Sequence, residues 1–229
     1  MDIGRAFAFV FDDDEWIKKI LIGGLITLIP LIGGFVAYGY MIEIVRRIYA
    51  EGDERLPEWD DFGGYLTRGF VLVVGTLIWF LPIFIVMGCL VALLAATTST
   101  SDGDGVAVLG GLMLFGLVSV MVLLIPVWAA VFLPILIGRY AIEQRFGAMF
   151  EFSEIIAEVR RVGAGPLLML FVTYLAASVV GQLGFIACFI GVIFTAFYAD
   201  LVVAHAAGQV YRRARGLGDI AQPSQAPAF

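Results

Sequence analysis

The sequence has only one histidine and very little lysine. Its 229 residues include the single histidine His205 and two lysines beside twelve arginines. One histidine excludes metal sites built from histidine clusters and the His-Glu-x-x-His motif of zinc proteases. The Gly-x-Ser-x-Gly nucleophile motif of α/β-hydrolases is also missing. We therefore expect no enzyme, with no catalytic residue, no cofactor-binding residue, no metal site and no bound cofactor.

Cysteine is almost as scarce. Cys89 and Cys188 are the two cysteines, and both lie in apolar sequence. We expect two small buried hydrophobic residues rather than a redox or metal pair. A disulfide between them remains geometrically conceivable, because the topology below places both in the outer half of a membrane.

Charged residues make up 15% of the chain, whereas 61% of it is hydrophobic and the mean hydropathy is +0.98. Soluble domains contain about 45–50% apolar residues, so this composition excludes an ordinary soluble domain. The net charge is −6 and the cations form no continuous basic face, so we expect no nucleic-acid partner. The fourteen cations fall into four clusters, at residues 5–19, 46–68, 139–161 and 212–215.

The gaps between these clusters have the lengths of transmembrane segments. Seventy residues without a cation separate Arg68 from Arg139, and fifty separate Arg161 from Arg212. A spanning helix needs about 20 apolar residues, so each gap holds two spans. The expected spans are residues 69–96, 106–138, 166–180 and 185–208, with a polar external turn at residues 97–105.

The cationic clusters also orient the chain. Cationic side chains stay preferentially on the cytoplasmic side of a membrane. Two even crossings leave the second, third and fourth clusters on one side. This pattern predicts a multi-pass protein of the cell membrane, with cytoplasmic Lys- and Arg-bearing loops and a cytoplasmic C-terminus.

The first gap is shorter and allows two interpretations. Only twenty-six residues separate Lys19 from Arg46, enough for one tilted span or for a short hairpin. One span would leave the first cluster outside, against the charge bias. Pro30 and the following glycines break the helix, because proline removes a backbone donor and glycine permits a turn. We favour a re-entrant hairpin with arms at residues 16–29 and 33–49.

Two segments have the pattern of helices that lie in the membrane interface. In residues 143–161, apolar residues recur at helical spacing while most acidic residues, including Glu158, fall outside that stripe. The stripe consists of Phe152, Ile155, Ile156 and Val159. Residues 3–11 contain three phenylalanines and are expected to lie in the interface as well.

The acidic loop before the second gap also has features of a membrane boundary. Trp59 and Tyr65 suit the lipid headgroup layer, and Asp60 or Asp61 can cap the helix that follows. Residues 1–213 are therefore expected to form a single helical membrane domain, followed by a flexible cytoplasmic tail at residues 214–229. The acidic start of the chain does not resemble a cleavable signal peptide. The predicted fold is an all-α, polytopic membrane protein with four spanning helices, an N-terminal re-entrant or short helical hairpin, and interfacial amphipathic helices.

The last predicted span contains a candidate intramembrane polar site made of Tyr198, Asp200, His205 and Gln209. Asp200 lies twelve residues before Arg212, hence about 18 Å from the inner interface and near the middle of the bilayer. Tyr198, His205 and Gln209 share one helical stripe, whereas Asp200 points about 140° away from His205. An ionisable group at this depth costs about 2.5–3.5 kcal/mol, so it should face a cavity or a partner.

Two interpretations of this site remain open. It is either an ion, proton or substrate site, or a structural anchor in which Asp200 bonds to a neighbouring helix. Gln182 and Tyr174 are candidate partners for such an anchor. We favour the anchor, because one acid and one imidazole are few groups for a pump.

Several motifs resemble those of a known membrane family. They are Leu-Pro-Glu-Trp-Asp-Asp at residues 56–61, Ala-His-Ala-Ala-Gly-Gln at residues 204–209, and the runs at residues 14–24 and 29–33. In these features, and across residues 1–213, the chain is similar to the prokaryotic family labelled domain of unknown function 4013. The resemblance implies an integral membrane protein common in archaea and some bacteria, with no established activity, cofactor or catalytic residue. The chain has Phe197-Tyr198 where family members often have a Pro-Trp pair.

Two functions are consistent with this sequence. The favoured one is a non-enzymatic membrane scaffold or complex subunit, surrounded by membrane lipids and packing against membrane-protein partners or itself. The alternative is a small-solute or ion transporter or channel that uses the polar groups of the last helix.

Overall fold

The computed structural model describes residues 2–99, 104–187 and 190–217, and this part of the chain contains helices and turns but no strand. An N-terminal segment, made of α1 (Ile3–Ala8) and the short 3-10 helix η1 (Phe9–Asp12), is followed by α2 (Trp16–Thr27) and α3 (Ile32–Ala50). Two long helices, α4 (Phe62–Ser99) and α5 (Asp104–Glu143), come next. The chain ends with η2 (Phe146–Phe150), α6 (Phe152–Val162), α7 (Ala164–Leu183), η3 (Gly184–Ala187) and α8 (Ile190–Ala214). The all-helical fold predicted from the sequence is confirmed.

The predicted break at Pro30 is confirmed, and it produces a helical hairpin of α2 and α3. Leu31 has a φ of 66°, and a Cβ at Gly33 would lie 2.1 Å from the carbonyl oxygen of Ile26, so the turn requires a glycine there. The twelve residues of α2 rise only about 18 Å, which is less than the roughly 30 Å hydrocarbon core of a bilayer. This helix is too short to cross a membrane by itself.

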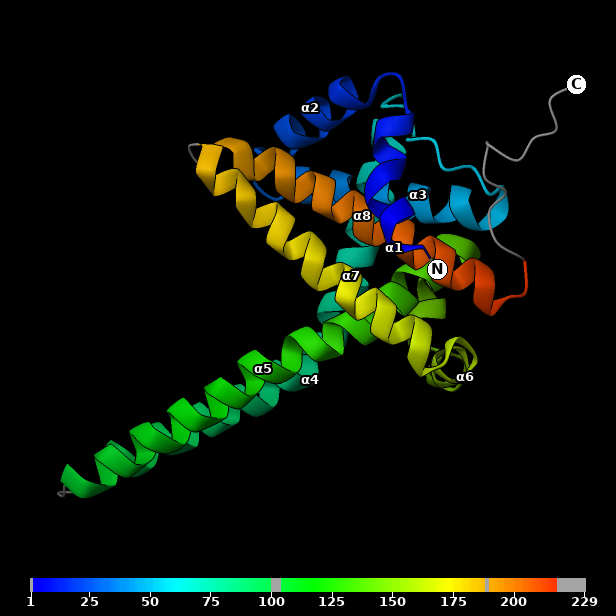
Figure 1. Cartoon of the computed structure of the whole chain (residues 1–229). Helices are drawn as coiled ribbons and strands as arrows, with labels where there is room; N and C mark the ends of the chain where they lie inside the picture. The colour runs from blue at the N-terminus through cyan, green and yellow to red at the C-terminus, as the bar shows by residue number, and fades with distance from the viewer. Residues whose placement is uncertain (1, 100–103, 188–189, 218–229) are drawn as a thin grey trace, which may run out of the picture.

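The hairpin of α4 and α5 is a long arm that extends away from the rest of the molecule (Figure 1). Its helices have 38 and 40 residues, which correspond to lengths of about 57 Å and 60 Å. Large apolar side chains along the arm are exposed, with Phe84 at 60% and Phe115 at 73%. Of the predicted turn at residues 97–105, residues 97–99 belong to α4 and residues 104–105 to α5, whereas residues 100–103 fall outside the described part of the chain.

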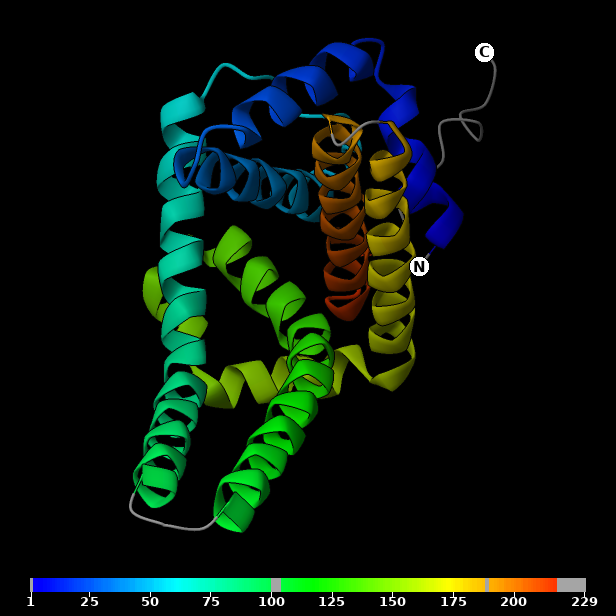
Figure 2. The same cartoon turned by 90° about the vertical axis from the view of Figure 1, so that its left-hand side faces the viewer.

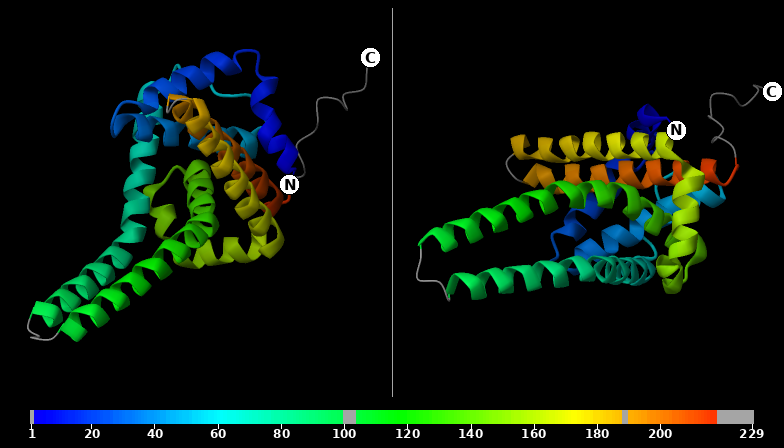
Figure 3. Two further views of the ribbon diagram at one scale, coloured as in Figure 1. Left: turned by 60° about the vertical axis from the view of Figure 1, so that its left-hand side comes forward. Right: turned by 90° about the horizontal axis from the view of Figure 1, so that it is seen from below.

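The second hairpin consists of α7 and α8, which lie side by side and antiparallel (Figures 2 and 3). The base of the α7–α8 hairpin lies beside α6, which also packs against the middle of α4 through Phe152 and Trp79, and the tips of the two hairpins diverge (Figures 1 and 3). Three helical stretches among the described residues are long and apolar enough to cross a membrane: Phe62–Leu93, Ala164–Ile186 and Ile190–Ala214. In α5, the described residues include the shorter apolar stretch Val108–Met121.

Hydrogen bonds and ion pairs connect the segments that contain the four cationic clusters. Arg5 binds Glu54 in the loop between α3 and α4 (residues 51–61, the α3–α4 loop). Arg212 donates to the carbonyl oxygen of Tyr49 at the end of α3, with an N–O distance of 2.9 Å. The guanidinium of Arg215 binds both carboxylate oxygens of Glu158 on α6, each at 3.1 Å. The charged loops are thereby held together rather than spread over the molecule.

Tyr65 and Trp59 pack against protein groups, and their predicted depth at the lipid headgroups stays a prediction. Tyr65 is 2% exposed, and its hydroxyl donates to the carbonyl oxygen of Glu58 at 2.6 Å. Trp59 stacks on Tyr40 with ring centroids 4.2 Å apart. The predicted cap on the next helix is present, because Asp61 accepts from the backbone N–H of Gly64 at 3.0 Å.

The two predicted interfacial segments are helical, but both are packed against the protein. Glu158, expected outside the buried stripe of α6, is 1% exposed because Arg215 and Arg161 neutralise it, while Phe152 is 59% exposed. The N-terminal segment crosses α8 and buries Phe9 there (Figure 1). Pairing with two arginines explains why Glu158 is buried, and contact with α8 explains why Phe9 is buried. Sequence periodicity reports neither contact.

Candidate functional site

The candidate site lies on α8, which runs through the centre of the helical body. Its middle turns contain small residues, and these let neighbouring helices approach closely. A Cβ added at Gly208 would lie 2.9 Å from the side chain of Ile48, so α3 packs directly against this backbone. Most residues from Phe197 to Tyr211 are buried. The polar side chains of α8 therefore meet protein groups on most sides rather than lipid or water.

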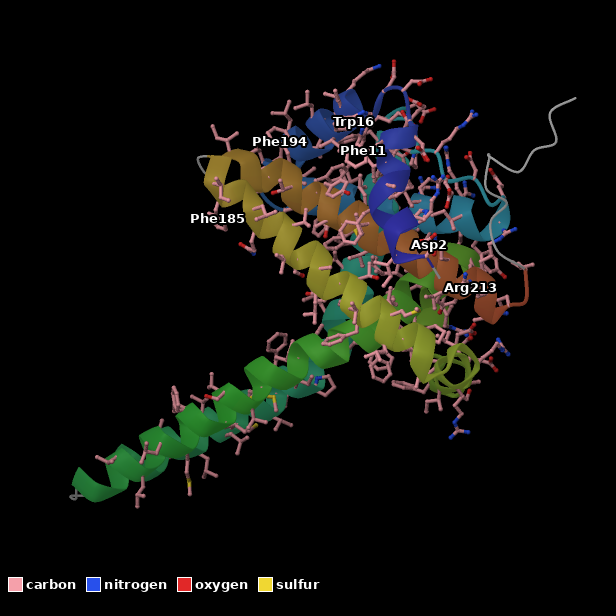
Figure 4. The ribbon with its side chains drawn as sticks, in the orientation of Figure 1. Asp2, Phe11, Trp16, Phe185, Phe194 and Arg213 are labelled. Atoms are coloured by element: carbon pink, nitrogen blue, oxygen red, sulfur yellow. The ribbon has the colours of Figure 1, made fainter. Side chains whose placement is uncertain are left out.

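One face of α8 holds the N-terminal segment in place. The hydroxyl of Tyr198 donates to the carbonyl oxygen of Phe7 at 2.6 Å. The Oε1 atom of Gln209 accepts from the backbone N–H of Asp2 at 3.1 Å. Figure 4 shows Asp2 beside α8 at the start of the segment, and Phe11 next to Trp16 at its far end. Tyr198 and Gln209 thus bind the two ends of α1 to the last helix.

Between these two contacts, His205 forms a buried polar cluster with Glu54 and Arg5. Its Nε2 atom lies 2.9 Å from a carboxylate oxygen of Glu54, and Nε of Arg5 lies 2.6 Å from the other oxygen. Phe9 stacks on the imidazole with ring centroids 4.2 Å apart, and His205 is 0% exposed. Since an ionised carboxylate only accepts hydrogen bonds, Nε2 is the protonated nitrogen of the ring.

The electrostatics of this cluster centre on Glu54. Burial of the side chain opposes its ionisation, but hydrogen bonds from His205 and Arg5 outweigh that effect, and the pKa of Glu54 is lowered from its ordinary value. The cluster joins three parts of the chain that are distant in sequence. Phe9 covers the imidazole, and we call this cluster of Arg5, Glu54 and His205 the latch.

Asp200 faces a different direction from these residues, as its helical position predicts. It lines a cavity of about 390 Å³ between α3, α4, α5, α7 and α8, which we call the lateral cavity. The polar residues of the lining are Tyr38, Thr76, Tyr174 and Asp200. The structure therefore divides the candidate site: Tyr198 and Gln209 bind the N-terminal segment, His205 belongs to the latch, and Asp200 lines a cavity.

A second cavity of about 200 Å³ lies between α7 and α8 and shares Asp200 and Tyr174 with the lateral cavity. Ser178 and Gln182 also line it. Tyr174 and Gln182, the candidate anchoring partners, thus both share a cavity with Asp200. Within the described part of the chain, however, no group forms a hydrogen bond or ion pair with the Asp200 carboxylate.

Sequence reasoning did not identify Glu54, Arg5 or Tyr38 as members of these sites. Glu54 lies in a run of charged residues and Arg5 in a short amphipathic segment, so neither has a local pattern that distinguishes it. Their positions depend on contacts between residues far apart in the sequence, such as Glu54 and His205, which are 151 positions apart. Among the described residues, no group of three or more His, Cys, Asp or Glu side chains could hold a metal ion. Cys89 is a free cysteine and is exposed, which corrects its expected burial, and Cys188 lies outside the described residues.

Comparison with known proteins finds a family and a relative whose descriptions name no activity. The family model described as "Protein of unknown function (DUF4013)" matches residues 22–197. The uncharacterized protein MJ1189 of Methanocaldococcus jannaschii is 29% identical over 181 residues, which are 76% of this chain and 59% of that protein. The chain thus spans less than two thirds of the length of this relative. No solved structure matches the chain.

Proposed function

Because this chain belongs to the DUF4013 family, whose description names no activity, we propose that it is a non-enzymatic membrane scaffold or complex subunit. Its apolar helices are compatible with an integral membrane protein. The observation that supports a scaffold is the α4–α5 arm, which presents a long apolar surface that the chain itself does not cover. Such a surface packs against lipid tails or against other membrane helices.

The glycines of the arm favour helix partners over lipid alone. Where α3 and α4 cross, Gly39 and Gly69 allow contact so close that a Cβ at Gly39 would lie 1.8 Å from the carbonyl oxygen of Tyr65. In the arm, Gly88, Gly111 and Gly116 have nothing within 4 Å of the position of a Cβ. Small residues in membrane helices promote close helix association, and here they remain open to a second helix.

The orientation of the scaffold follows from its charges. We propose that the charged end, where the Arg215–Glu158 pair and the latch lie, faces the cytoplasm of a cell membrane, and that the tip of the arm lies on the other side. Cationic loops prefer the cytoplasmic side, and ion pairs join the loops of this chain at one end. Membrane lipids would surround the arm, and partner helices would pack against its exposed glycines Gly88, Gly111 and Gly116.

The test of the scaffold is its assembly state in lipid. The full chain would be purified in nanodiscs and cross-linked, with and without a double substitution Gly111→Leu and Gly116→Leu. We expect the parent to form a dimer or a complex with co-purified membrane proteins, and the double variant to lose it. Gly63→Leu is the matched control, because Gly63 also has nothing within 4 Å but lies at the other end of α4. A parent that is monomeric and has no co-purifying partner would contradict the proposal.

A transporter or channel for an ion or small solute is the second candidate, and the position of Asp200 on a cavity wall favours it. Polar groups within the membrane commonly mark transport paths. The test is flux into proteoliposomes, comparing the parent with Asp200→Asn and His205→Ala. Loss of flux in Asp200→Asn but not in His205→Ala would support a path through the cavity. A parent that conducts none of the tested ions or solutes would contradict it.

A further inference from the structure

The lateral cavity has a position that the scaffold role does not explain. It lies where the α4–α5 arm and the α7–α8 hairpin begin to diverge, and helices of both hairpins contribute to its wall (Figure 1). Its volume of about 390 Å³ is in the range of small-molecule sites, which measure about 300–1,000 Å³. The cavity is therefore large enough for a compact organic molecule.

The charge of the cavity indicates what kind of molecule fits. Among the described residues of its lining, Asp200 is the only carboxylate, and none is Lys, Arg or His. Within the described residues, nothing forms a hydrogen bond or ion pair with this carboxylate. An unpaired ionisable group at membrane depth is costly, so a cationic occupant would complement it. Tyr38 and Tyr174 add hydroxyls and aromatic rings, and aromatic faces attract organic cations.

The same lining is unsuitable as a binding site for a divalent metal ion. Calcium takes about 6–8 oxygen ligands and magnesium requires an octahedral set. Asp200, the two tyrosines and Thr76 are the polar residues of the lining, and its other members are apolar. The apolar members are Met41, Leu72, Val73, Leu77, Phe80, Leu133, Pro134, Ile137, Leu170 and Val203. An apolar molecule that carries one positive charge matches this wall better than a calcium or magnesium ion does.

Exposure of the rim indicates the route of entry. Tyr38 is 41% exposed and Leu77 is 56% exposed, so the cavity opens on the apolar side of the helices. Tyr174 lies ten residues into α7, about 15 Å from the start of that helix, which is deeper than lipid headgroups reach. A ligand dissolved in the hydrocarbon layer can reach this position, whereas the ammonium of a lipid headgroup stays near the interface.

We propose that the lateral cavity is a binding site for a lipophilic organic monocation, with its ammonium beside Asp200 and its apolar body among the α4 and α5 side chains. This inference goes beyond the scaffold role and does not depend on it. Binding is also distinct from transport, since it requires no second opening.

The experiment measures equilibrium binding of radiolabelled benzyltrimethylammonium to the full chain in nanodiscs at pH 8, with empty nanodiscs as background. We expect saturable binding to the parent, and binding at least about tenfold weaker in Asp200→Asn, because a desolvated charge pair is lost without a change of shape. Asp14→Asn is the matched control, since Asp14 is exposed and lies outside the cavity. Asp200→Glu should restore part of the affinity.

Choline, as a second probe, makes the outcome decisive. Choline has the same trimethylammonium group without the large apolar body and should bind at least about tenfold more weakly, because it leaves the apolar wall unfilled. Equal binding of choline would indicate a headgroup site and would overturn the proposal. Absence of saturable binding to the parent, or equal binding to Asp200→Asn, would overturn it as well. Circular dichroism of each variant checks that it is folded, and none of these results depends on the assembly state that tests the scaffold.

Discussion

The imidazole of His205 on α8 lies 2.9 Å from the carboxylate of Glu54, a loop residue 151 positions earlier in the chain. Glu54 also receives the guanidinium of Arg5, so this one carboxylate connects the N-terminal segment, the α3–α4 loop and the last helix. The side chain of Glu54 is 10% exposed and His205 is fully buried. The cationic end of the molecule is thus held by a specific long-range contact as well as by the turns between its helices.

Replacing Glu54 by Gln should destabilise the protein. The substitution keeps the size of the side chain but leaves a buried imidazole N–H and the Arg5 guanidinium with a weaker acceptor, which costs about 1–3 kcal/mol. The measurement is the thermal unfolding midpoint in detergent. Glu51→Gln, at an exposed position of the same loop, should leave the midpoint nearly unchanged. Equal midpoints for parent and Glu54→Gln would show that the latch contributes nothing.

Acid should remove the contribution of Glu54. Its pKa is lowered in the folded protein by hydrogen bonds from His205 and Arg5 that outweigh burial, so its ionised form stabilises the fold above its ordinary pKa of about 4.3. That stabilisation is lost as the pH falls through the lowered pKa. The difference in unfolding midpoint between parent and Glu54→Gln should therefore be constant from pH 7 to about pH 5 and shrink below it. A difference that grows on acidification would contradict this assignment.

Glu158 should be essential for docking the end of α8 on α6. It is 1% exposed and is bound by both Arg215 and Arg161. Glu158→Ala removes one side of a buried ion pair, which costs about 3–5 kcal/mol at a fully buried site and less here because both arginines are partly exposed. We expect faster trypsin cleavage after Arg215 in the variant than in the parent. Glu154→Ala, at an exposed position of the same helix, should be cleaved at the parent rate.

The crossing of α3 and α4 should tolerate no side chain at Gly39. A Cβ there would lie 1.8 Å from the carbonyl oxygen of Tyr65, so Gly39→Ala must push the helices apart and should destabilise by at least about 2 kcal/mol. Gly63→Ala, near the start of α4 and in open space, should be neutral or stabilising by about 0.5–1 kcal/mol, because alanine favours a helical backbone. Unfolding midpoints of the two variants test the contrast.

The two ends of the α4–α5 arm should lie on opposite sides of the membrane. In a background with Cys89 and Cys188 replaced by Ala, an impermeant thiol reagent added to intact cells should label Asp104→Cys at the tip of the arm. Arg145→Cys, in the connector after the arm, should be labelled only after permeabilisation, because the cationic loops prefer the cytoplasm. Labelling of Arg145→Cys in intact cells would reverse or refute the proposed orientation.

Local chemistry in the sequence was sufficient for the helical class, the helix breaks and the grouping of the cations. Pro30 and the glycines near it terminate helices through their own backbone properties, and apolar length identifies helices that can cross a membrane. Helical periodicity also placed Asp200 on a different face from His205. These features depend on neighbours within a few residues, so the chain reports them directly.

Tertiary structure alone decided which partners the polar groups have. Glu54 beside His205, Arg215 beside Glu158, and Tyr38 opposite Asp200 are each pairs of residues far apart in sequence, and no local periodicity distinguishes them from solvated residues. Their positions follow from how closely helices pack at glycines and from the need to pair charges removed from water. For this reason the sequence alone determined a membrane-type helical protein, whereas the latch and the cavity beside Asp200 exist only in the folded arrangement.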